Sequence, residues 1–283
     1  MKKLKTVFNQ LKSLNGGEPS DMINLLWQLI CYSPKMPVRL QQQQLLDEAK
    51  PFTLEVDDPH FAKSALKFNG FVWGDGQRKI LITHGWGSKA ADFAELIAAL
   101  KNIDDTQIIA FDAPGNGSSE GELSNLLLFA KAAGAVIKTF GAPDVIIGHS
   151  LGGMANAIAI KETGIKPALL ISIAPLMNLK ENFIASLNAA DVAASAQDKF
   201  FTDFESLFNM DASGFTLNNL YPAGSVTRHW LAYDPEDKIA PFPFLKSFLA
   251  AHPEVETSVY EGLGHEKIIK DENLIADLVR LIA

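Results

Sequence analysis

The stretch VIIGHSLGGMANAIAI, residues 145–160, places a serine where it could act as a nucleophile. An apolar run leads into Gly-His-Ser-Leu-Gly, and an alanine-rich helix pattern follows directly. A sharp strand-to-helix turn holds such a serine in a strained conformation, and Gly148 and Gly152 leave room where larger side chains would clash. The alternative is a tight turn with an idle serine. Ser150 is a nucleophile only if other groups activate it.

Activation of a serine needs two further side chains. A hydroxyl is a weak nucleophile until an imidazole takes its proton, and a carboxylate must fix the tautomer of that imidazole. The helix that starts at Leu151 adds a donor, because its amino end presents the Leu151 backbone N–H to a developing oxyanion. The fold must therefore bring one histidine and one carboxylate to Ser150.

From about residue 50 onward, short apolar runs that end in turn residues alternate with helical stretches. Continuous apolar runs indicate strands buried on both faces, and their alternation with helices predicts an α/β fold with a mostly parallel sheet covered on both sides. Two earlier runs, FTLEV and ALKFNGFVWG, have a period of two and predict an antiparallel pair at the sheet edge. The later runs are KILIT, QIIAF, VIIGH, ALLISIAP, RHWLAY and ETSVY.

In an open parallel sheet, ligands bind in the crevice where the loops after the strands meet. The polar or loop residues directly after the predicted strands are therefore candidates: His84, Gly85, Trp86, Asp112 to Gly117, Ser150, Asp234, Asp237 and His265. A nucleophile, an acid and a base occur among them in the order Ser, Asp, His.

Five motifs, each after a predicted strand, resemble those of the α/β-hydrolase superfamily, specifically its serine hydrolases of the esterase and lipase kind. In chain order they are HGWG, DAPGNGSS, GHSLGG, DPEDKIAP and GLGH. The resemblance covers roughly residues 50–283. It implies an α/β-hydrolase fold: a mostly parallel central sheet with helices on both faces and an inserted helical cap.

The resemblance also implies roles for single residues. The residue after His-Gly in the first loop, Trp86, is expected to donate its backbone N–H to the oxyanion, while His84 and Gly85 shape that loop. The turn D-K-I-A-P at 237–241 resembles the acid-bearing turn of the family, so Asp237 is favoured as the acid. Asp234 is then expected to be a solvated loop carboxylate.

His265 is the expected base among the six histidines. It follows the last strand in a GLGH turn, as in the family, and an ordinary imidazole, with a pKa near ~6.5, suits a general base at neutral pH. His229 and His252 fall at the starts of strands, and His60 precedes the alternation of strands and helices. His149 is expected to point away from Ser150, and His84 is expected to hold its own loop.

The DAPGNGSS element is expected to shape a turn. Asp112 is predicted to hydrogen-bond the backbone, and Asn116 replaces the His or Phe that is commoner in the family, with no catalytic role lost.

Three parts of the chain are expected. The core comprises residues 51–175 and 225–283. Residues 176–224 carry no convincing strand and many phenylalanines, which favours a helical cap insertion. Residues 1–50 are predicted to form a helical extension packed on the core.

The residues at the start of the chain bear on membrane attachment and on export. Leu4, Val7, Phe8, Leu11 and Leu14 recur at helical spacing with a basic far face, which favours a helix packed on the domain over attachment to a membrane surface. Polar residues interrupt any signal-peptide core, so a cytoplasmic location is expected.

Composition excludes several classes of function. The chain has 33 acidic and 25 basic residues and one cysteine, so neither nucleic-acid binding nor an internal disulfide is expected. Metal-ligand spacings, a P-loop and a G-x-G-x-x-G turn are missing, so we expect no metal and no cofactor. The oligomeric state is left open.

The expected function is hydrolysis of an ester of a small or medium apolar molecule through an acyl-enzyme intermediate. Thioesterase, amidase or peptidase, and C–C hydrolase activities use the same groups and stay open. So do a non-catalytic ligand-binding homologue and a lipase that attaches to membranes by its basic first helix.

Overall fold

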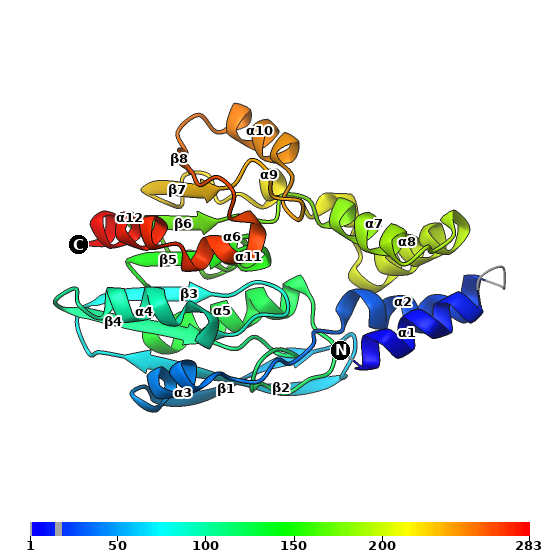
Figure 1. The fold of residues 1–283 in the computed structure, drawn as a ribbon, viewed down its shortest axis with the longest axis horizontal. Helices are drawn as coiled ribbons and strands as arrows, with labels where there is room; N and C mark the ends of the chain where they lie inside the picture. The colour runs from blue at the N-terminus through cyan, green and yellow to red at the C-terminus, as the bar shows by residue number, and fades with distance from the viewer. Residues whose placement is uncertain (1, 15–18) are drawn as a thin grey trace.

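A twisted sheet forms the centre of the computed structural model, which describes residues 2–14 and 19–283 (Figure 1). Within these residues the sheet has eight strands in the order β1-β2-β4-β3-β5-β6-β7-β8. The strands are β1 Lys50–Asp58, β2 Ser64–Trp73, β3 Arg78–Thr83, β4 Thr106–Phe111, β5 Val145–His149, β6 Leu169–Ile173, β7 Arg228–Tyr233 and β8 Glu256–Val259.

Strands β3 to β8 run parallel, whereas β1 pairs with β2, and β2 with β4, in the antiparallel sense. The predicted antiparallel pair at the sheet edge and the mostly parallel sheet are therefore confirmed. Because the parallel strands share one direction, their carboxyl ends lie at the same edge of the sheet.

Helices cover both faces of the sheet. Along β3, Ile80 and Ile82 join the apolar cluster under α4 and α12, while Leu81 joins the cluster under α5 and α6. This alternation explains why the strands read as continuous apolar runs: every side chain is buried on one face or the other. The helices around the sheet are α3 Leu40–Asp47, α4 Ala94–Leu100, α5 Leu126–Phe140, α6 Leu151–Thr163, α10 Phe242–Ala251, α11 Gly264–Lys267 and α12 Glu272–Ile282, with short 3₁₀ turns at η1 Ala90–Phe93 and η3 Ile268–Lys270.

A helical insertion lies between β6 and β7, as expected. Its elements are α7 Leu179–Ala189, α8 Ala194–Phe208, η2 Ala212–Gly214 and α9 Leu217–Leu220. Phe200 and Phe204 of α8 are buried, and Phe183 of α7 packs against both rings. Most of the aromatic side chains thus hold the insertion together and fix it above the sheet edge.

Two helices at the start of the chain lie beside the insertion (Figure 1). They are α1 Lys2–Ser13 and α2 Pro19–Cys31, and α2 packs on both α7 and α8. Val7 and Leu11 of α1 are buried, so the apolar face predicted from the helical spacing packs against protein. No helix of the described part of the chain is long and apolar enough to cross a membrane.

Candidate active site

Ser150 occupies a strained turn between β5 and α6. Its backbone has φ +53° and ψ −122°, a conformation that costs a non-glycine residue about 1–3 kcal/mol. Hydrogen bonds on both sides hold it there: the Ser150 N–H donates to the Ile173 carbonyl (3.1 Å), and the Ser150 carbonyl accepts from the Leu176 N–H (3.1 Å). In this conformation Ser150 lines the cavity described below, together with His265.

Two glycines of this turn, Gly148 and Gly152, lie where a side chain would meet backbone atoms. A Cβ on Gly152 would lie 2.4 Å from the Thr83 carbonyl oxygen, and one on Gly148 would lie 2.6 Å from Gly153 Cα. Both obstacles are backbone atoms that cannot rotate away. Any side chain at position 148 or 152 must therefore displace the elbow itself.

Substitution of Gly152 by alanine should lower the free energy of unfolding by about 1–3 kcal/mol, because overpacking against backbone forces the strands apart. Gly153→Ala is the matched control, since the nearest atom to its Cβ is Pro175 Cβ at 3.3 Å and alanine suits a helix interior. Urea unfolding followed by circular dichroism measures both. Equal stability of the two variants would contradict the packing argument.

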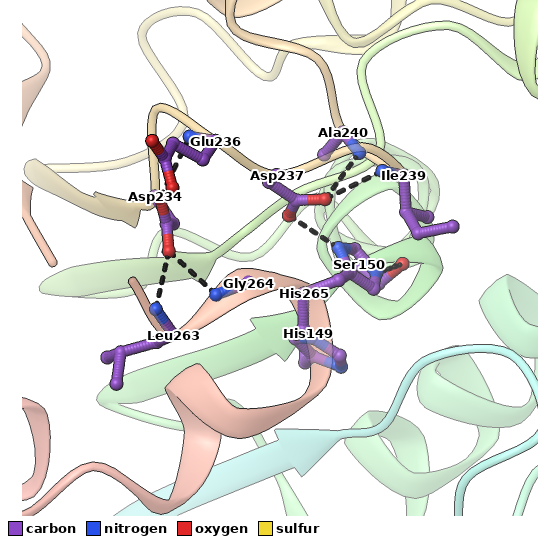
Figure 2. Close-up of polar contacts among 10 residues, drawn as sticks. All are labelled: His149, Ser150, Asp234, Glu236, Asp237, Ile239, Ala240, Leu263, Gly264 and His265. Atoms are coloured by element: carbon purple, nitrogen blue, oxygen red, sulfur yellow. Dashed lines mark hydrogen bonds and ion pairs between the residues drawn. The ribbon is translucent and has the colours of Figure 1, made fainter. Parts of the chain in front are cut away.

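Ser150, His265 and Asp237 form one hydrogen-bonded row (Figure 2). His265 Nδ1 lies 2.7 Å from Asp237 Oδ2, and His265 Nε2 lies 2.8 Å from Ser150 Oγ. Since a carboxylate can only accept, Nδ1 carries the proton and donates it. In the neutral ring Nε2 is then free to accept the Ser150 hydroxyl proton.

Asp237 is buried in a tight turn that its own side chain stabilises. Its Oδ1 accepts the backbone N–H groups of Ile239 (2.7 Å) and Ala240 (3.0 Å), which leaves Oδ2 for His265. Burial opposes ionisation, yet the hydrogen bond and charge of His265 and these two N–H groups hold the pKa of the carboxyl below its ordinary value. Asp237 is thus an anion at neutral pH.

Asp234 is not the solvated carboxylate that the sequence suggested: only 1% of its surface is exposed. Its Oδ2 accepts the N–H groups of Leu263 (2.7 Å) and Gly264 (2.6 Å), and Oδ1 accepts that of Glu236 (2.8 Å), as Figure 2 shows. Burial opposes its ionisation, but these three bonds lower the pKa. Asp234 therefore ties the β7 loop to the loop that carries His265.

His149 also lies closer to the site than expected. Its ring packs against that of His265, with centroids 4.9 Å apart, and its Nε2–H donates to the His265 carbonyl (2.9 Å). Burial, with the charge of His265 as the next cause, lowers the pKa of His149 to about 3. His149 is therefore a neutral neighbour that supports the His265 backbone.

Hydrogen bonds of His84 and Asn116 stabilise the loop after β3. The Ala113 N–H donates to His84 Nε2 (2.9 Å), so Nδ1 carries the proton and donates to the Gly85 carbonyl (2.7 Å). Asn116, which the sequence predicts to lie in a turn, accepts the Gly87 N–H (3.2 Å) and is fully buried. Asp112 accepts backbone N–H groups, as predicted.

The expected oxyanion donors, Trp86 and Leu151, line the same cavity as Ser150. Among the residues that the structure describes, neither backbone N–H donates to a protein acceptor. Gly85 lies so close to the elbow that a Cβ there would be 2.9 Å from Ser150 Cβ. The loop that carries Trp86 thus packs directly against the Ser150 elbow.

A cavity of about 660 Å³ opens over the row and is of the size that holds small-molecule ligands. Ser150, His265, Trp86 and Leu151 line it. One group of lining residues is apolar: Trp27, Leu126, Phe183, Phe204 and Phe208. Another is polar and joined by hydrogen bonds: Gln42, Ser88, Lys89 and Asp92.

Buried neutral histidines make the stability of the fold sensitive to acid. Burial lowers the pKa of His229, which bonds Ser172 Oγ (2.9 Å), to about 3. The unfolded chain takes up the proton near pH 6.5, so this stability is present above that pH and is lost as pH falls toward 3.

Lowering the pH from 7 to 5 should reduce the free energy of unfolding by about 2 kcal/mol for each such histidine. Urea unfolding at both pH values measures the loss. In His229→Gln the loss should be smaller by that amount, whatever the stability of the variant at pH 7. A loss as large as that of the wild type would exclude His229 as its source.

No cluster of three or more His, Cys, Asp or Glu side chains in residues 2–14 and 19–283 is arranged to hold a metal ion.

The mostly parallel sheet, its helices on both faces and the helical insertion define the α/β-hydrolase class of fold. A model of the Alpha/beta hydrolase family matches residues 80–269, two thirds of the chain. The chain belongs to that family.

The chain is similar to proteins that are named as a lipase and an esterase. A monoglyceride lipase from Rattus norvegicus is 28% identical over 153 residues, 51% of this chain and 49% of its own. The chain thus spans about half the length of this curated relative. A Pyrococcus furiosus esterase superposes with a TM-score of 0.61 at 14% identity, over 89% of this chain and 96% of that one.

Another solved structure, alpha/beta hydrolase domain-containing protein 10 from mouse, gives a TM-score of 0.59 at 17% identity, over 82% of this chain and 96% of its own. At such identities the likeness shows the fold.

Proposed function

We propose that this protein is a serine hydrolase that cleaves an ester of a small or medium apolar molecule. The observation that carries the proposal is the row Ser150–His265–Asp237, with distances of 2.8 and 2.7 Å, open to the cavity. The esterase and lipase names among the relatives support the ester as the substrate class.

In the first half of the reaction, Ser150 Oγ attacks the acyl carbon while His265 Nε2 takes the hydroxyl proton. The negative charge that develops on the acyl oxygen is stabilised by the backbone N–H groups of Trp86 and Leu151. His265 then returns the proton to the departing alcohol oxygen, which leaves an acyl group on Ser150. Asp237 keeps the imidazole oriented and stabilises its cationic form.

In the second half, a water molecule gives a proton to His265 and its oxygen attacks the acyl carbon. The bond to Ser150 Oγ breaks, and His265 returns the proton to the serine. This half releases a carboxylic acid and restores the Ser150 hydroxyl. Ser150, His265 and Asp237 thus return to their initial protonation states.

The three parts of the chain have different tasks in this proposal. Residues 51–175 and 225–283 form the core and supply the reacting groups, and residues 176–224 form the cap over them. Within the extension, residues 1–50, α2 packs on α7 and α8 of the cap, and α3 packs on α4 and η1 of the core. The apolar part of the substrate lies against the aromatic side chains of the cap.

A panel of p-nitrophenyl esters and matched thioesters with two to twelve acyl carbons tests the proposal on the full chain. We expect turnover of the esters, an optimum at medium length, and labelling by a fluorophosphonate probe. Faster turnover of thioesters would assign the site to thioester substrates. Folded protein that turns over no acyl substrate and takes up no probe would overturn the proposal in favour of a binding role.

A further inference from the structure

The cavity over Ser150 is walled in part by the N-terminal extension, which lies outside the family match at residues 80–269. Trp27 and Ile30 of α2 line it, and so do Met36 and Val38 in the irregular chain that follows. These residues come from a part of the sequence to which neither the motifs nor the elbow assign a task.

The extension is fastened to both sides of the cavity. Trp27 Nε1–H donates to Asp203 Oδ2 of α8 (2.7 Å), and the Trp27 ring packs on Phe204 at 6.0 Å between centroids. Further along, the Ser124 N–H donates to the Cys31 carbonyl (2.8 Å), and Ser33 Oγ donates to Asn116 (2.5 Å). Residues 27–33 therefore hold a fixed position between cap and core.

Beyond these attachments, the extension exposes apolar side chains at the cavity. Seven large apolar side chains are exposed in the described part of the chain, and three of them line this cavity. These are Met36, 50% exposed, Val38, 39% exposed, and, in the turn after Asp237, Ile239, 49% exposed. Apolar groups that face solvent beside a ligand cavity mark a surface that an apolar ligand covers.

We propose that residues 27–38 form the wall that selects the apolar chain of the ester. Trp27 and Ile30 contact the inner part of the apolar chain of the ester. Met36 and Val38 cover the part of that chain that reaches the mouth of the cavity. The inference rests on the proposed function for the reaction, although the binding that it describes is measurable without turnover.

The double variant Met36→Ser/Val38→Ser tests the wall at positions whose exposure makes misfolding a small risk. The ratio of kcat/KM for p-nitrophenyl decanoate to that for the acetate should fall about tenfold, because two apolar contacts with the long chain are lost. The matched control is Met210→Ser/Val259→Ser, with 45% and 49% exposure and no place in the cavity lining, which should keep the wild-type ratio.

Decyl and ethyl acetate, tested in the same way, tell whether the wall receives the acyl or the alcohol chain. A ratio that is unchanged in Met36→Ser/Val38→Ser for both series overturns the inference and leaves the proposed function intact.

Calorimetry of decanoate binding to the full chain tests the wall without any hydrolysis. The inference can therefore be judged even if the protein hydrolyses no ester and the proposed function fails. We expect the dissociation constant to rise about tenfold in Met36→Ser/Val38→Ser and to stay unchanged in Met210→Ser/Val259→Ser. Equal affinity of both double variants would overturn the inference.

Discussion

Replacing Ser150 by alanine should abolish ester hydrolysis, with a fall in kcat of about 10⁴- to 10⁶-fold. The reason is chemical: without Oγ no acyl-enzyme bond can form, and His265 Nε2 loses the hydroxyl that lies 2.8 Å away. What remains is the stabilisation of an oxyanion by the Trp86 and Leu151 amides, which supports only slow attack by water. Initial rates with p-nitrophenyl butyrate over long incubations measure the residual activity.

The matched control is Ser206→Ala, on an exposed face of α8 where the hydroxyl donates to the Thr202 carbonyl. This variant should keep wild-type turnover and fluorophosphonate labelling, whereas Ser150→Ala should lose both with its circular dichroism unchanged. Labelling of folded Ser150→Ala at the wild-type rate would mean that another residue is the nucleophile.

Most of the fold could be predicted because buried parallel strands leave a plain record in the sequence. The runs of Ile, Leu and Val along β3, β5 and β6 mark strands buried on both faces, and all six predicted runs after residue 74 are strands. The elbow was equally visible, since its two glycines are required by backbone atoms only 2.4 and 2.6 Å from the missing Cβ positions. Local steric demands of this kind act on neighbouring residues, so they show in a short motif.

Tertiary contacts between distant residues left no such record. Asp234 and Asp237 are both aspartates that follow β7. The sequence does not show that Asp234 accepts hydrogen bonds from the Leu263 and Gly264 N–H groups, because these lie 29 and 30 positions away. The hydrogen bond from His149 Nε2–H to the His265 carbonyl likewise joins residues 116 positions apart. The side chains of the extension reach the cavity because α2 packs on α8, which no local pattern specifies.

The two aspartates after β7 should respond very differently to the same substitution. In Asp237→Asn the amide oxygen can still accept the Ile239 and Ala240 N–H groups, so the amide nitrogen faces His265 Nδ1. That amide nitrogen is a donor, so it favours the His265 tautomer with the proton on Nε2. In this tautomer Nε2 can no longer accept the hydroxyl proton of Ser150. We expect kcat to fall about 10⁴-fold with the fold retained.

In Asp234→Asn, by contrast, both carboxylate oxygens accept backbone N–H groups, so the amide nitrogen must face a donor whichever way it is turned. Leaving a buried donor unpaired should lower the free energy of unfolding by about 1–3 kcal/mol. The loop that carries His265 becomes less rigid, but the tautomer of His265 does not change. We therefore expect kcat to fall only about tenfold, which is typical when a residue that orients another functional residue is replaced. Rates and urea unfolding of the two variants separate the roles, and a larger loss of kcat in Asp234→Asn would reverse the assignment of the acid.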